Sequence, residues 1–254
     1  MRTSHNPVMN RMLPSTVKAN QAEVDAQFDQ IVSSQKMTIG GVAIKMVGLF
    51  ALLLAGAFVA WNITGNIPEL ALRMLLPTVI VTFVLSLVIT FSKNVHPVAV
   101  VTYAVVEGFF IGVLSFFFED MYSGIVMNAV LGTLVTAGAM FLAYSMGWIK
   151  VTSGFTKAMM FALIGYALFG IGNLIFGLFT NSAGVYSGPY AWVAGLVGVG
   201  LAAFCLNLDF NTISKGVEQG LPREFEWRAS FGLLVTMVWL YLEILRLLAI
   251  FSRD

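Results

Sequence analysis

Charged residues are scarce in this 254-residue chain, and their scarcity excludes most classes of soluble protein. Only 11% of the residues are charged, whereas 58% are hydrophobic and the mean hydropathy is +0.86. A soluble domain covers its surface with about 25% charged residues, so we expect most of this surface to face a lipid bilayer. The net charge of +1 gives no indication of a nucleic-acid partner.

Cysteine and histidine are scarcer still. The single Cys205 excludes an internal disulfide and a cysteine-based zinc site, and His5 and His96 are too few for a transition-metal centre. We therefore expect no tightly bound cofactor. The sequence also lacks HExxH, GxSG and GxGD motifs and a phosphate-binding glycine loop, so we do not expect an enzyme.

Long apolar runs fill the chain beyond residue 36. A helix needs about 20 apolar residues to cross a bilayer, and seven such runs occur, at residues 42–61, 70–91, 98–118, 125–146, 158–179, 190–210 and 229–251. Strands of a membrane barrel alternate apolar and polar residues, which these continuous runs do not. The sequence therefore predicts an all-α membrane protein, with a seven-transmembrane helix bundle over residues 37–254.

The ends of the chain and the loop charges indicate an orientation. Residues 1–36 are polar and lack the apolar core of a secretory signal, so we expect a mobile cytosolic tail, with a short amphipathic helix at about residues 17–32 as the alternative. Basic residues concentrate on the cytosolic side of membrane proteins. Here Arg73 and Arg253 lie on one side, and the other carries Arg2, Arg11, Lys18, Lys36, Lys45, Lys93, Lys150, Lys157, Lys215, Arg223 and Arg228. We expect the N-terminus inside and the C-terminus outside.

Three acidic residues fall within the apolar runs: Glu107, Asp209 and Glu243. A charge at the centre of a membrane helix costs about 2.5–3.5 kcal/mol. Glu243 lies about 12 Å from the outer end of its run by helix rise, and Glu107 lies near the centre of its own. Both must be protonated, paired or exposed to a wet cavity. Arg246 is only about 7.5 Å from the same end, so its long side chain can either reach the interface or face the interior.

Small and polar residues recur at steps of three and four, which places them on one face of a helix. Such faces let membrane helices approach closely. They are the Gly108–Gly112 pair, a stripe in the sixth run (Ala194, Gly198, Ala202, Cys205, Asp209) and a stripe in the last (Gly232, Thr236, Trp239, Glu243, Arg246). Two interpretations of the last stripe remain open. In the first, Glu243 and Arg246 form an ion pair that only orients the helix. In the second, the acids mark a path for ions or protons.

Three segments resemble the Bax inhibitor family, also called YccA-like or transmembrane Bax inhibitor motif proteins. They are YAVVEGFFIGVLS in the third run, LNLDFNTI at the end of the sixth and WLYLEILRLLAIF in the last. GVEQGLPREFEWR and the early NPV resemble its bacterial, actinobacterial branch. The resemblance covers roughly residues 37–251. It implies seven helices in a bacterial cell (inner) membrane and a pH-sensitive calcium leak.

In that family, two acids in the last two helices share a proton and act as a latch. Carried over, they fall on Asp209, in LNLDF, and on Glu243, in LYLE where the family usually has LYLD. Neighbouring carboxylates cannot both ionise in a low dielectric, and their hard oxygens suit calcium as ligands. Helix rise, however, offsets Asp209 from Glu243 by about 12 Å. Tilt or bending at Gly195, Gly198 and Gly200 must remove this offset if the two acids are to meet.

The sequence leaves three functions open. The first is a pH-gated cation (calcium) leak that senses pH through Asp209 and Glu243, with Arg246 as counter-charge and Glu107 lining the path. The second is a non-conducting regulator that binds a membrane protease or another complex through its N-terminal tail and the loop before the last helix. The third is a proton-coupled transporter.

In the loop before the last helix, Pro222 followed by Glu224 and Glu226 predicts the first turn of that helix.

Overall fold

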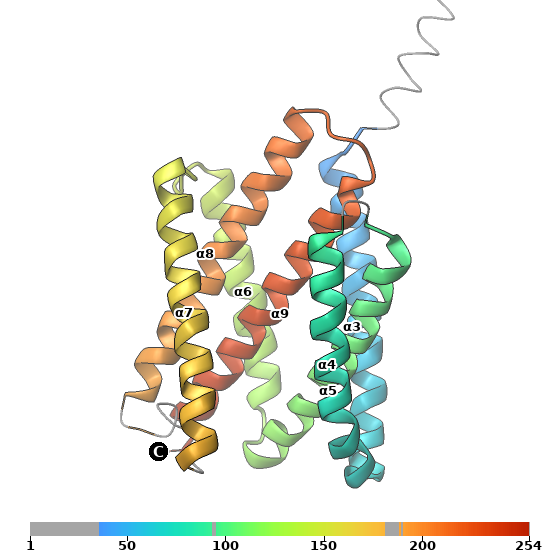
Figure 1. Cartoon of the computed structure of the whole chain (residues 1–254), viewed down its shortest axis with the longest axis vertical. Coiled ribbons are helices and arrows are strands. Elements are labelled where there is room, and N and C mark those ends of the chain that lie inside the picture. The colour runs from blue at the N-terminus through green and yellow to red at the C-terminus, as the bar shows by residue number, and fades with distance from the viewer. Residues whose placement is uncertain (1–35, 93–94, 181–187, 189, 254) are drawn as a thin grey trace, which may run out of the picture.

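The chain forms a bundle of long helices with almost no other regular structure (Figure 1). The computed structural model describes residues 36–92, 95–180, 188 and 190–253. In this part it has seven helices: α3 (Ile39–Asn66), α4 (Pro68–Phe91), α5 (Pro97–Met121), α6 (Ile125–Ser145), α7 (Ser153–Thr180), α8 (Ala191–Glu218) and α9 (Phe225–Phe251). All seven are long and apolar enough to cross a membrane. The predicted all-α, seven-helix membrane fold is confirmed. The predicted tail, residues 1–36, lies outside the described residues except for Lys36.

Local chemistry explains where several helices begin. The Thr38 side chain caps α3 by accepting a hydrogen bond from the Gly41 amide at 2.9 Å. Proline occupies the start of α4 and of α5, where its missing N–H costs no helical hydrogen bond. Gly124 takes a left-handed conformation (φ 83°) at the tight turn into α6. As the loop chemistry predicts, α9 begins just after Pro222 and carries Glu226 in its first turn.

Helix α9 crosses the middle of the bundle. Figure 1 shows it running obliquely between α3, α4 and α5 on one side and α6, α7 and α8 on the other. Helices α5 and α9 are the most buried, whereas α4 and α7 expose most of their surface, as helices facing lipid do. The central core gathers Leu234, Leu240 and Leu245 of α9 with Leu206 of α8 and Val100 of α5. The helix that carries Glu226 and Glu243 is therefore one of the two most buried in the bundle.

Helices α3 and α5 approach each other most closely, at a row of glycines. A Cβ atom at Gly108 would overlap the backbone of Leu53, and one at Gly112 would overlap the backbone of Ala57. On the α3 side of the same contact, a Cβ atom at Gly56 would overlap the carbonyl oxygen of Val105. Backbones can approach this closely only where side chains are absent. The Gly108–Gly112 pair is thus a packing motif, as the sequence predicts.

We expect Gly108→Ala to destabilise the bundle, because the added methyl must displace backbone atoms of α3. Overpacking of this kind costs about 1–3 kcal/mol. The measurement is the thermal unfolding midpoint of the purified protein in detergent. Gly138→Ala on α6 is the matched control, because a Cβ there meets open space. Equal midpoints for the two variants would contradict the close crossing.

Candidate functional site

Glu243 lies at the meeting point of α7, α8 and α9, with 2% of its surface exposed. Its Oε1 accepts hydrogen bonds from the Tyr166 hydroxyl at 2.9 Å and from the Trp239 indole N–H at 3.0 Å. Arg246 donates to Oε1 at 3.2 Å and to Oε2 at 3.1 Å, forming an ion pair one turn along α9. The carboxylate is therefore paired inside the bundle, and both interpretations of the Glu243–Arg246 pair start from this contact.

The room for this cluster comes from the small-residue face of α8. A Cβ atom at Gly198 would overlap both the Glu243 carboxylate and the Tyr166 hydroxyl. The rings of Tyr166 and Trp239 lie next to each other, with their centroids 6.0 Å apart. The Arg246 side chain is 39% exposed, so its charge lies at the edge of the bundle while that of Glu243 lies within. The Glu243 cluster (Tyr166, Gly198, Trp239, Glu243, Arg246) thus joins three helices around one carboxylate.

Asp209 lies on α8 and has a different environment. Its side chain lies beside the Thr236 hydroxyl of α9, and that hydroxyl also donates to the Gly232 carbonyl at 3.1 Å. The Asp209 Oδ2 atom is buried without a hydrogen-bond partner among the described residues. The side-chain amide nitrogen and oxygen of Asn207, two positions earlier, are also buried without a hydrogen-bond partner among the described residues. This turn of α8 therefore contains buried polar groups that no other described residue satisfies.

The structure does not bring Asp209 and Glu243 together. Glu243 faces Gly198, which is eleven positions from Asp209 along α8 and thus about 16 Å away by helix rise. Thr236, which lies beside Asp209, is seven positions from Glu243, or about 10 Å. No hydrogen bond joins the two carboxylates, although both residues are described. The antiparallel alignment of α8 and α9 preserves the offset, and the tilt or bend that direct proton sharing requires is not present.

Glu107 lies on α5, on the other side of α9 from α8 (Figure 1). It is buried, with its carboxyl beside the Thr82 hydroxyl of α4 and near Tyr103 one turn earlier. No ion pair involves it among the described residues. In the same part of the chain, no group of three or more His, Cys, Asp or Glu residues could hold a metal ion. The acids are therefore spread through the bundle, not gathered at one site.

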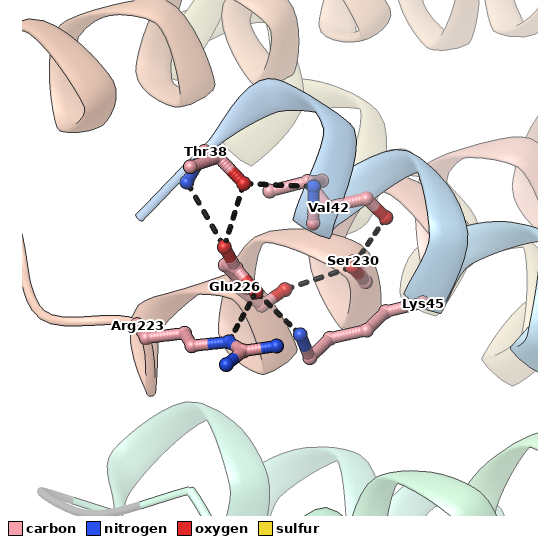
Figure 2. Close-up of polar contacts among 7 residues, drawn as sticks. Thr38, Val42, Lys45, Arg223, Glu226 and Ser230 are labelled. Carbon is pink, nitrogen blue, oxygen red and sulfur yellow. Dashed lines mark hydrogen bonds and ion pairs between the residues drawn. The ribbon is translucent and has the colours of Figure 1, made fainter. Parts of the chain in front are cut away.

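The most completely paired acid, Glu226, was not predicted as a site. It is 1% exposed and lies where α9 begins against the start of α3 (Figure 2). Its Oε1 accepts hydrogen bonds from the Thr38 amide at 2.9 Å and the Thr38 hydroxyl at 3.1 Å. Its Oε2 pairs with the Lys45 ammonium and lies 3.8 Å from the Arg223 Nε. A Cβ at Gly41 would overlap this carboxylate, so a larger residue there would displace the Glu226 side chain from its present position.

Further contacts extend the Glu226 cluster (Thr38, Gly41, Lys45, Arg223, Glu226) into a joint between two chain segments. The Ser230 hydroxyl donates to the Val42 carbonyl at 3.0 Å (Figure 2), and the Met37 amide donates to the Leu221 carbonyl at 2.7 Å. The sequence indicates only a helix-dipole role for Glu226, because its hydrogen-bond partners Thr38 and Lys45 lie more than 180 positions away. The single local signal is an acid in the first turn of an apolar helix.

Seven apolar helices with buried, paired carboxylates define a multi-pass membrane protein. Comparison with known families gives the more specific assignment: the family described as Bax inhibitor 1 like matches residues 6–253, nearly the whole chain. The chain therefore belongs to this family, as its third, sixth and seventh apolar runs indicate. A search of curated proteins found no match to the chain.

Replacing Glu226 with glutamine should destabilise the protein strongly. The change leaves Lys45 beside a neutral group in a largely buried position, and breaking a buried ion pair costs about 3–5 kcal/mol. The thermal unfolding midpoint in detergent should fall by far more than in Glu224→Gln, which removes the same charge from an exposed neighbour. A similar midpoint for both variants would show that the Glu226 cluster contributes little to stability.

Proposed function

We propose that this protein is a pH-sensitive cation (calcium) leak channel of the bacterial inner membrane. Membership of the Bax inhibitor 1 like family supports the proposal. The observation that carries it is the buried, unpartnered Oδ2 of Asp209. An unsatisfied buried group costs about 1–3 kcal/mol, and more when charged, so it needs a proton, water or a cation. Carboxylate oxygens are the ligands that calcium prefers.

In the proposed mechanism the two acids act at different depths instead of sharing a proton. Glu243 holds α7 and α9 together in the closed state, because its oxygens accept hydrogen bonds from Tyr166 of α7 and from Trp239 and Arg246 of α9. Protonating Glu243 removes its attraction to Arg246 and weakens the link between α7 and α9. Asp209 offers a carboxylate to the cation farther along α8. Glu107 is a path-lining acid on the α4–α5 side, reached only if the bundle opens.

Calcium flux into vesicles containing the purified protein, measured across a pH series, tests this mechanism. Glu243→Gln should raise flux at neutral pH about tenfold, because a charge-assisted hydrogen bond contributes roughly 1.5–3 kcal/mol to the closed state. Asp209→Asn should change the calcium flux and its pH dependence independently of the change at Glu243. Because the two side chains do not touch, the double variant should combine both effects to within about 0.5 kcal/mol.

Glu69→Gln is the control, because it removes an exposed acid from the first turn of α4. Flux curves that Asp209→Asn and Glu243→Gln both leave unchanged would reject the sensing role. Strong non-additivity in the double variant would instead favour a shared proton. Saturable uptake of another solute, driven by a pH gradient, would indicate a proton-coupled transporter.

A non-conducting regulator is the second candidate, and one observation favours it. The end of the N-terminal tail and the loop before α9 lie side by side, since Lys36 pairs with Pro222 and Met37 bonds to Leu221. A membrane protease or another complex can therefore contact both segments at once. Among the described residues, this contact of Lys36 and Met37 with the loop supports the regulator as the second candidate.

Deleting residues 1–35 separates these two functions. If the protein is a regulator, the truncated chain should fail to complement a strain lacking the protein, while calcium flux in vesicles stays at the full-length level. Keeping Lys36 and Met37 preserves the contacts with Pro222 and Leu221, so the control is an unchanged thermal midpoint. Full complementation by the truncated chain would remove the tail from the regulatory mechanism.

A further inference from the structure

A half-open cavity of about 1050 Å³ lies beside the Glu226 cluster. Its walls come from α3, from α9 and the residues just before it, and from the start of α5 with the residues that precede it. These are the ends of the helices on one side of the bundle, next to the α4–α5 and α8–α9 loops (Figure 1). The cavity therefore lies at the end of the bundle where α3, α5 and α9 begin.

The rim of the cavity is charged. Lys45 and Arg223 both line it and both approach the same oxygen of Glu226, so two cations meet around one carboxylate (Figure 2). The Arg223 side chain is 66% exposed, and within the described residues its terminal nitrogens have no protein partner. Glu224, also in the wall, is exposed and supplies the opposite charge. The rim thus presents a cationic pair next to a separate carboxylate.

The deeper wall is apolar. Leu49 and Leu52 of α3 and Val101 of α5 line it, and Trp227 of α9 also lines the cavity. The Lys45 ammonium lies 5.4 Å from the centroid of the Trp227 indole, and tryptophan is enriched at the headgroup level of membranes. Farther along, α3 and α5 are in tight contact, where Gly56 meets Val105. Towards their beginnings the two helices leave a space between them.

We propose that this cavity binds a phospholipid whose headgroup carries both a phosphate and a primary ammonium, as in phosphatidylethanolamine. Lys45 and Arg223 bind the phosphate, Glu224 binds the ammonium, and an acyl chain lies along Leu49 and Leu52. The rim carries both positive and negative side chains and the deeper wall is apolar. A lipid with a phosphate, an ammonium and acyl chains matches this arrangement. A free phosphate would leave the apolar wall empty, and a purely anionic lipid would leave Glu224 unpaired. The lipid site does not depend on the proposed leak.

Lipid binding to the purified full-length protein can be measured by native mass spectrometry with phosphatidylethanolamine, phosphatidylcholine and phosphatidylglycerol of identical chains. We expect tightest binding to phosphatidylethanolamine. Gly48→Leu should weaken it about tenfold, because Gly48 lines the cavity and a side chain there enters open space without meeting the backbone. Gly138→Leu on α6, where a Cβ also meets open space, should leave binding unchanged.

Two charge variants test the rim. Arg223→Gln should weaken all three lipids, and Glu224→Gln should abolish the preference for phosphatidylethanolamine over phosphatidylcholine. Lys215→Gln and Glu218→Gln, which neutralise exposed residues at the end of α8, are the charge-matched controls, and thermal midpoints verify folding. Equal affinity for the three lipids, or unchanged binding in a folded Gly48→Leu, would overturn the proposal. Binding that arises only after residues 1–35 are deleted would also overturn it, by identifying the tail as the occupant.

Discussion

The hydrocarbon core of a bilayer offers no hydrogen bonds to a carboxylate, so an acid buried in a membrane bundle finds its partners within the protein. Helix α9 meets this constraint twice. Glu226 near its beginning binds Thr38 and Lys45 of α3, and Glu243 towards its end binds Tyr166 of α7. The two anchors are about 25 Å apart by helix rise, which is most of the thickness of the hydrocarbon core. Helix α9 is therefore fixed to opposite sides of the bundle at its two ends.

The acids that lack such partners contrast with these anchors. Within the described residues, Asp209 has a buried oxygen without a partner and Asn207 has an unsatisfied amide, and Glu107 lies beside the neutral Thr82 hydroxyl and forms no ion pair. Paired groups stabilise one arrangement of helices, whereas unsatisfied groups favour any arrangement that brings them water, a proton or a cation. The paired acids therefore stabilise the helix bundle mainly at the two ends of α9. The unsatisfied buried side-chain atoms within the described residues lie on α8.

Much of the architecture could be predicted because lipid constrains it strongly. Seven apolar runs specify seven helices, Gly108 and Gly112 specify a close crossing, and Pro222 with Glu226 specifies the beginning of α9. The structure adds helix ends that apolar runs cannot reveal, since α8 continues to Glu218 beyond the predicted end of its span. The pairing of Glu243 with Arg246 follows from their spacing on one helix. Its bonds to Tyr166 do not, because they require α7 to pack there.

The sequence by itself determined which residues are acidic, apolar or small, and therefore the helix count, the buried faces and the family. Only the tertiary structure decided which charges meet. Helix rise suggested an offset between Asp209 and Glu243, but tilt and bending could have removed it, and only the alignment of α8 against α9 shows that it persists. The link between Lys45 and Glu226 joins the first described helix to the last. Periodicity along one helix carries no information about contacts of that kind, because they depend on how separate helices pack.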